Sequence, residues 1–168
     1  MNPAETLDKE QETPEAPPQK WIGHKAKRFS LSLLVLFGLA VFFYLNFHTV
    51  IVSGHSMDPT FSTGERLVAS KAYWLVGPIK DNDIVVIATG KPGEYIIKRV
   101  YKMGGEIVDW PNAPQKWAFA NGEFKVPPGC VYVLGDNRPI SEDSRIFGPV
   151  PVNRIIGKII RVSSTLRL

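Results

Sequence analysis

The feature that constrains this chain most is an uncharged apolar segment at residues 29–47, with the sequence FSLSLLVLFGLAVFFYLNF. A helix of these 19 residues, at 1.5 Å per residue, is about 28 Å long and matches the ~30 Å hydrocarbon core of a bilayer. A cleaved signal peptide would have a shorter apolar core followed by small residues, whereas this segment ends in Tyr44, Asn46 and Phe47. A buried helix of a soluble protein is the alternative, but helices apolar on every face are rare in domains this small. The sequence therefore predicts a transmembrane helix over residues 29–47.

The residues before this segment predict how the chain is oriented. Residues 1–20 are polar and include four prolines, so they cannot bury enough apolar surface to fold and are expected to be disordered. A basic cluster without any acidic residue follows, made of Lys25, Lys27 and Arg28. Because basic residues accumulate on the cytoplasmic side of a membrane helix, residues 1–28 are expected to form a cytoplasmic tail with a basic flank. Residues 48–168 would then form an extracytoplasmic domain behind a single membrane crossing.

Residues 48–168 have the pattern of a mostly β domain. Short β-branched runs recur there, separated by turn signals rich in glycine and proline. The runs are HTVIVSG (48–54), RLVASKAYWLV (66–76), DIVVIAT (83–89), YIIKRVYKM (95–103), CVYVLGD (130–136) and IIGKIIRV (155–162). Residues 109–124 contain two prolines and an Asn-Gly pair, which predict a loop or a small hairpin.

The composition disfavours several classes of function. The net charge of +4 is spread along the chain without a basic block, which disfavours a nucleic-acid binder. Cys130 is the only cysteine, so neither an internal disulfide nor a cysteine metal site can form. The three histidines, His24, His48 and His55, lack metal-ligand spacing. We therefore expect neither a metal nor a cofactor.

The first candidate for chemistry is Ser56, in the segment SGHSMDPTF at residues 53–61. The segment follows a strand-like run, Gly54 permits either a close backbone approach or an unusual backbone dihedral, and Pro59 sets a turn. A serine where a strand breaks into a loop is well placed for catalysis, since catalytic groups concentrate on loops held by a rigid scaffold. Taken alone, these residues fit a plain turn serine better.

The second candidate is Lys98, in the run EYIIKRVYKMGGE. Side chains alternate faces along a strand, so Ile96, Lys98 and Val100 would share one face while Arg99 points to the other. Burial between apolar neighbours, with no compensating anion, lowers the pKa of a lysine, and the like charge of Arg99 would add to that effect at modest range. A neutral lysine can take the proton of a serine hydroxyl. The more common alternative for a lone lysine is an edge-strand residue that reaches solvent.

The third candidate is a polar segment, GDNRPISEDSRIFGPVP, at residues 135–151. It follows an apolar strand and begins with a Gly-Asp-Asn turn signal. Its density of charged and hydroxyl side chains indicates a polar network at the mouth of a site. A solvated loop is the alternative interpretation.

Together the three segments resemble the boxes of the type I signal peptidases, the leader peptidases of the serine–lysine class. SGHSMDPT is similar to the nucleophile box of that family, YIIKRV followed by Gly-Gly-Glu to its lysine box, and GDNRPISEDSRIFGPVP to its third box. DNDIVVI is also similar to a family strand, but Asn82 stands where glycine is usual. The order of the boxes behind one membrane helix makes the resemblance very specific.

The resemblance implies roles for individual residues. Ser56 matches the nucleophile and Lys98 the general base, while Ser141 matches a serine that orients the lysine amine. Asp143 and Arg145 match a pair that braces the third box. The backbone N–H of Ser56 would donate to the oxyanion; the second donor in some members is a serine hydroxyl at the position of Gly54, so its identity is open here, with Ser53 as a neighbouring candidate. The residues that match the small substrate pockets are Val52, Phe61 and Ile97.

The resemblance also implies a fold, a reaction and a location. The fold would be a mostly β catalytic domain of two antiparallel sheets, with an apolar surface against the membrane. The enzyme would be a serine endopeptidase of the bacterial cytoplasmic membrane that removes signal peptides from exported preproteins through an acyl-enzyme. Shallow pockets would favour small residues one and three positions before the cut. The partners expected are preproteins and the phospholipid bilayer, with no nucleic acid.

Three alternatives remain from the sequence. A Ser–His mechanism is disfavoured, because neighbours on an extended chain such as His55 and Ser56 point opposite ways, and His48 lies at the membrane boundary. A single-pass β domain that binds a partner without catalysis does not account for Ser56, Lys98 and Ser141 in matching boxes. A specialised relative that processes pilin or conjugation substrates is compatible with the sequence.

Overall fold

The structure is a computed structural model that describes residues 20–160 of the chain. The disordered tail predicted for residues 1–20 therefore falls almost entirely outside the described residues, as do residues 161–168. The chain divides into two compact units, residues 1–41 and residues 42–168.

A single long helix, α1 (Lys20–Asn46), contains the apolar segment. Within the described residues, one stretch, Arg28–Asn46, is long and apolar enough to cross a membrane, and none of it is buried by the rest of the protein. The helix ends one residue before the predicted limit. Phe47 instead opens strand β1, where it pairs with Ser70.

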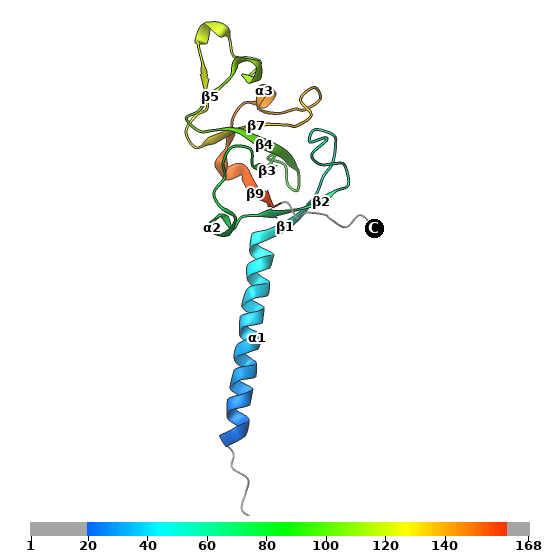
Figure 1. Ribbon diagram of the computed structural model, residues 1–168, viewed down its shortest axis with the longest axis vertical. Helices are drawn as coiled ribbons and strands as arrows, with labels where there is room; N and C mark the ends of the chain where they lie inside the picture. The colour runs from blue at the N-terminus through cyan, green and yellow to red at the C-terminus, as the bar shows by residue number, and fades with distance from the viewer. Residues whose placement is uncertain (1–19, 161–168) are drawn as a thin grey trace, which may run out of the picture. The chain divides into compact units, whose positions relative to one another are not determined.

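The second unit is built mainly from antiparallel strands (Figure 1). The larger sheet has seven strands in the order β1 (Phe47–Ile51), β2 (Arg66–Ser70), β9 (Ile155–Ile160), β3 (Ile84–Ala88), β4 (Tyr95–Met103), β7 (Cys130–Leu134) and β8 (Val150–Pro151). A separate antiparallel pair, β5 (Ile107–Val108) and β6 (Phe124–Lys125), flanks the region for which a loop or small hairpin was predicted. The prediction of a mostly β domain with two antiparallel sheets is confirmed.

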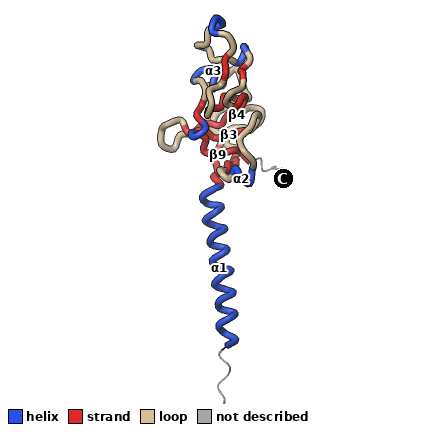
Figure 2. Tube along the Cα trace, turned by 90° about the vertical axis from the view of Figure 1, so that its left-hand side faces the viewer, coloured by secondary structure: helices blue, strands red, loops and turns tan. Residues whose placement is uncertain are grey.

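Short helical turns lie in the connections, which occupy much of the domain (Figure 2). They are α2 (Tyr73–Val76), α3 (Ser144–Phe147) and the 3₁₀ turns Trp110–Asn112, Phe119–Asn121 and Val152–Arg154. The prediction of strand character through residues 73–76 is wrong. Strand β2 ends at Ser70, where its partner β1 begins, and the N–H groups of Leu75 and Val76 then bond to the carbonyl of Ala72.

Strands β3 and β4 separate two apolar clusters, because alternate residues point to opposite faces of the sheet. The first cluster contains Val86, its cross-strand partner Ile97, and Val52 from the segment after β1. The second contains Ile87 with Ile96 packed against it, Val100, and Val150 of β8. Lys98 lies opposite Val85, a member of the second cluster, so its side chain shares the face of that cluster.

Asn82 stands where glycine is usual in the family strand that DNDIVVI resembles, and its backbone conformation explains why asparagine fits there. Its φ is +69°, the left-handed region that asparagine tolerates better than most residues. The Asn82 N–H donates to the carbonyl of Val100, and the Asn82 carbonyl accepts from the guanidinium of Arg99. The turn before β3 therefore keeps the conformation that glycine would give.

Candidate active site

Several of the candidate residues line one open pocket of about 410 Å³. Its walls come from the end of β1, the turn that follows, and the first half of β4. Ser56 and Lys98, 42 positions apart in the sequence, both line it. Further lining residues include Val52, Gly54 and Ile97.

The Ser56 turn is held on both sides. The Val52 N–H donates to the Glu65 carbonyl at 2.9 Å, and the Thr63 hydroxyl donates to the Gly54 carbonyl at 2.8 Å. Gly54 has a φ of +89°, as its sequence position predicted, and space around it is open. The restriction at this position is therefore backbone conformation rather than close packing.

Unpaired backbone donors line this turn. Within residues 20–160, none of the five N–H groups from Ser53 to Met57 donates a hydrogen bond, and the Ser56 hydroxyl makes none. Successive free N–H groups in a turn form a concavity that binds anions. The imidazole of His55 bonds to the Asp58 carboxylate at 2.9 Å, is 68% exposed, and is not part of the pocket wall.

Lys98 is buried, with 3% of its surface exposed. Its Nζ donates to the Ser141 hydroxyl at 3.1 Å. No carboxylate in the described part of the chain lies within ion-pair distance of Nζ. Arg99, on the opposite face, instead forms an ion pair with Asp136, so the alternation predicted for this strand is confirmed.

Burial lowers the pKa of Lys98 below its usual value, because the ammonium loses its solvation. The nearby carboxylates of Asp143 and Glu142 oppose this shift, and the guanidinium of Arg145 adds to it. The expectation from the sequence that no anion would oppose the effect of burial on Lys98 is therefore wrong. That expectation considered only the residues of strand β4, whereas both carboxylates belong to the third box. The charge that assists the shift comes from Arg145 rather than from Arg99.

Asp143 and Arg145, which the resemblance implied to brace the third box, form an ion pair. Asp143 is fully buried; its carboxylate accepts from Arg145 Nε at 2.9 Å, from Arg145 Nη2 at 3.0 Å and from the Gly135 N–H at 3.0 Å. Burial would raise the pKa of Asp143, but these hydrogen bonds outweigh it and lower the pKa below its usual value. The carboxylate thus remains ionised and fixes the loop that carries Ser141.

Gly135 is a close-approach position that sequence reasoning did not single out. A β carbon there would lie 2.1 Å from Ser141 Oγ and 2.6 Å from the Ser56 carbonyl oxygen. Its φ is outside the left-handed region, so the restriction is space rather than conformation. The Gly-Asp-Asn signal marked this turn, but nothing local to it indicates contact with Ser56, which lies 79 residues earlier.

We expect Gly135→Ala to lower kcat/KM about 10²-fold, because displacing Ser141 and Ser56 by about 1 Å is enough for such a loss. Peptide cleavage and thermal unfolding should be measured together. Gly104→Ala is the matched control: its β carbon would meet backbone atoms at 2.9–3.2 Å, away from the pocket. The control should lose stability and keep its kcat. Unchanged activity of Gly135→Ala would contradict the packing described.

Two further residues connect the boxes and were not predicted. Asp136 receives two hydrogen bonds from Arg99, at 2.8 and 2.6 Å, and one from the Thr60 hydroxyl at 2.5 Å. Asn137 donates from its amide to the His55 carbonyl at 3.1 Å and from its backbone to the Ser56 carbonyl at 3.0 Å. The third box therefore holds the peptide groups on both sides of Ser56.

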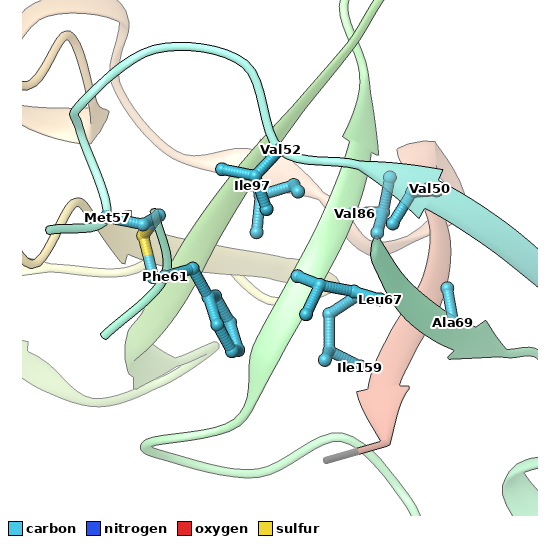
Figure 3. Packing of buried hydrophobic residues seen from close by; sticks show 9 residues of the cluster. All are labelled: Val50, Val52, Met57, Phe61, Leu67, Ala69, Val86, Ile97 and Ile159. Carbon is cyan, nitrogen blue, oxygen red and sulfur yellow. The ribbon is translucent and has the colours of Figure 1, made fainter. Parts of the chain in front are cut away.

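The three predicted pocket residues are buried in one cluster (Figure 3). Val52 and Ile97 line the pocket, and their side chains lie side by side. Phe61 belongs to the same cluster but does not reach the pocket wall, and packs behind it near Met57. The role of all three as pocket residues stays a prediction.

Within the described residues, no group of three or more histidine, cysteine, aspartate or glutamate side chains is arranged to hold a metal ion. The pocket itself brings together the Ser56 hydroxyl, the buried amine of Lys98 and free backbone N–H groups.

The chain is similar to known proteins over most of its length. The family model for signal peptidase, peptidase S26, matches residues 25–116 and 111–163. A signal peptidase I of Bacillus caldolyticus is 32% identical over 157 residues, covering 77% of this chain and 84% of that protein. A signal peptidase IB of Staphylococcus aureus strain COL is 29% identical over 140 residues, covering 64% of this chain and 73% of that protein. The crystal structure of a signal peptidase I from Enterococcus faecalis V583 is 24% identical, with a TM-score of 0.39 over 49% of this chain and 97% of that one.

Proposed function

The chain belongs to the peptidase S26 family of signal peptidases, and we propose that Ser56 and Lys98 form its catalytic dyad. Membership makes the protein a serine peptidase that removes signal peptides. The proposal adds which residues do so, how they share protons, and that they work at a membrane surface. Cleavage of a preprotein with an Ala-x-Ala site by the detergent-solubilised full chain tests it.

The single observation that carries the proposal is that Lys98 is buried and lines the same pocket as Ser56. A lysine with 3% exposure and no carboxylate partner among the described residues is costly to keep charged. Such a lysine gives up its proton more easily than a free one, which is the property a general base requires. A purely structural position would be filled at lower cost by an apolar side chain.

The proposed reaction has two stages. Neutral Lys98 takes the proton of the Ser56 hydroxyl while Oγ forms a bond to the scissile carbonyl carbon. The resulting ammonium returns the proton to the leaving amine, and an ester to Ser56 remains. Water then gives a proton to Lys98 and attacks the ester, which releases the signal peptide and restores the hydroxyl. Ser141 accepts a hydrogen bond from Nζ and so keeps the amine oriented through both stages.

The substrate would bind as an extended chain. Strand β4 pairs with β3 through residues 95–99 but with β7 only from Arg99 onward, so the other edge of residues 95–98 has no strand partner among the described residues. An exposed edge accepts a peptide as an added strand. Val52 and Ile97 leave room in the pocket for small side chains one and three positions before the cut.

The oxyanion would form beside the free N–H groups of the Ser56 turn. The His55 carbonyl and the Ser56 N–H belong to one planar peptide group and point opposite ways. Asn137 holds that carbonyl from the third box, so it orients the N–H toward the pocket. Asn137 is thus a positioning residue for the first oxyanion donor, while Ser53, which lines the same pocket, remains the proposed source of a second.

We expect Asn137→Asp to lower kcat by about 10- to 10²-fold with little change in KM, a part of the 10²–10³ that one oxyanion donor contributes. A carboxylate cannot donate to the His55 carbonyl, although the backbone bond to Ser56 remains. Asn137→Ala adds no charge and should behave alike, whereas Asn121→Asp at an exposed position should keep wild-type kinetics. Wild-type kcat in both Asn137 variants would contradict this role.

Helix α1 would anchor the enzyme in the bacterial cytoplasmic membrane as a single span. The proposed orientation, with residues 1–28 in the cytoplasm and the β domain outside, is supported by the basic residues before the span. In that orientation Ser56 is on the side where the cleavage site of an exported preprotein emerges. The preprotein and the bilayer are then the two partners of the enzyme.

A further inference from the structure

A second cavity, of about 230 Å³, lies beside the proposed active site and has no role in the mechanism above. Its walls are mostly apolar: Ile87 and Ile96 come from strands β3 and β4, and Phe147 and Val150 from α3 and β8. Thr89 and Ile96 line both this cavity and the active-site pocket. The two hollows therefore share a wall.

The second cavity lies on the face of the second apolar cluster, which also carries Lys98, whereas the active-site pocket is lined by residues from both faces of the sheet. Val52 and Ile97, proposed to contact the small substrate residues, belong to the first apolar cluster. Ile96 and Val150 belong to the second cluster, on the other face. A peptide that lies along the free edge of β4 extends its side chains alternately toward these faces. If the first and third residues before the cut face Val52 and Ile97, the even-numbered residues face the second cavity.

The position of the cavity along β4 indicates which of the even-numbered residues before the cut would face it. Lys98 pairs with Val85, while the cavity is lined by Ile87, Ala88 and Thr89, two to four residues further along β3. At about 3.3 Å per residue its centre lies roughly 10 Å from the level of Lys98. For a peptide that runs parallel to β4, that is three residues upstream of the one at the scissile bond.

We propose that this cavity binds the side chain of the fourth residue before the cut, and that it prefers a large apolar group. The assignment rests on the proposed function, because it needs the peptide to lie on β4 with its scissile bond at Ser56. Phe147, 46% exposed at the cavity wall, is free to cover such a side chain. An alanine there would leave most of the hollow unfilled.

Arg154 gives the cavity a charge preference. It is exposed, lines the cavity, and has no acidic partner in the described part of the chain. A cation at the edge of the hollow attracts an acidic side chain and repels a basic one, and exposed pairs of this kind change selectivity by up to about fivefold. Glutamate is therefore tolerated at the fourth position better than lysine.

The test uses the detergent-solubilised full chain and peptides with alanine at the first and third positions before the cut. One set carries Ala, Leu, Glu or Lys at the fourth position, and a second set carries the same residues at the fifth, which faces the opposite side. The ratio of kcat/KM between peptides is taken within each enzyme variant, so a general loss of activity cancels. We expect Leu to exceed Ala about tenfold at the fourth position and to show no such preference at the fifth.

The variants are Phe147→Ala and Arg154→Glu, both at exposed positions. Ile140→Ala, 59% exposed and outside the cavity, controls for the first, and Lys125→Glu on the small sheet controls for the second. Phe147→Ala should bring the Leu-to-Ala ratio at the fourth position to within about twofold of unity. Arg154→Glu should change the Glu-to-Lys ratio about fivefold in favour of Lys, and the controls should retain the wild-type ratios.

If the wild-type enzyme cleaves these peptides with the same kcat/KM whatever residue stands at the fourth position, the assignment is overturned and the proposed function stays intact. The same holds if Phe147→Ala leaves the Leu-to-Ala ratio unchanged, or changes it at the fifth position instead. Failure of the wild type to cleave any peptide or a preprotein would remove the proposed function and this inference with it.

Discussion

Replacing Ser56 with alanine should abolish preprotein cleavage, with a loss of about 10⁶ in kcat, the loss seen when the nucleophile of another serine protease is removed. The hydroxyl provides the atom that becomes acylated, so no neighbouring group can take over its step. The fold should be unaffected, because this hydroxyl makes no hydrogen bond within residues 20–160. Cleavage of a preprotein with an Ala-x-Ala site and the thermal unfolding midpoint are the two measurements.

Ser62→Ala is the matched control for this variant. Ser62 lies in the same loop, is exposed and does not line the pocket, so its loss should leave cleavage at the wild-type rate. Wild-type cleavage by Ser56→Ala would end the assignment of Ser56. Loss of activity together with a large fall in the unfolding midpoint would show that Ser56 matters for folding instead.

Replacing Lys98 with arginine should be equally severe, because a guanidinium cannot release its proton in the range where the enzyme works. Wild-type kcat/KM should rise with pH as Lys98 loses its proton and then level off, at a pH below the ~10.4 of a free lysine. Lys98→His should keep at most a trace of activity, with its rise moved to lower pH. A pH–rate profile of the three proteins measures this. Substantial cleavage by Lys98→Arg would show that Lys98 supplies only charge, and His48 would be the first other base to test.

The lowered pKa of Lys98 has a second effect, on stability, that does not depend on activity. Between the folded-state pKa and the unfolded value near 10.4, the unfolded chain binds more protons than the folded one. Unfolding free energy should therefore rise with pH across that window in the wild type. Lys98→Met has no such proton and should lack this contribution to the rise, while its stability near neutral pH should match or exceed the wild type. Identical pH dependence in both proteins would mean that Lys98 is not desolvated.

The sequence predicted those features that depend on local pattern. The nine-residue run YIIKRVYKM forms β4 with the predicted limits. The alternation of side chains along it correctly predicted that Lys98 is buried and that Arg99 points to the other face. The glycine at position 54 was expected to permit either a close backbone approach or an unusual dihedral, and the structure shows the dihedral. Each of these depends on residues within a few positions of one another, where strand period and backbone sterics decide the outcome.

Features that depend on distant segments were missed. Nothing near Tyr73–Val76 indicates that the pairing of β2 with β1 stops at Ser70. A strand was therefore expected where a helical turn forms. The acids that oppose the pKa shift of Lys98 come from a loop more than 40 residues away, and no strand pattern reveals them. Gly135, Asp136 and Asn137 were seen as a turn, but their contacts with the Ser56 and Arg99 segments are purely tertiary.

Helix α1 and strand β1 are consecutive in the chain, which limits the distance between the end of the helix and Ser56. Asn46 ends the helix and Phe47 begins the sheet, and the Lys71 N–H donates to the Asn46 carbonyl at 2.9 Å. Ser56 follows ten residues later, and even a fully extended chain would span only about 35 Å over that distance. With the anchor proposed here, enzyme and preprotein search for each other in the plane of one bilayer, so turnover follows their surface density rather than their concentration in bulk solution. Under that proposal, proteins that never enter this thin layer would escape cleavage, whatever small-residue sites they carry.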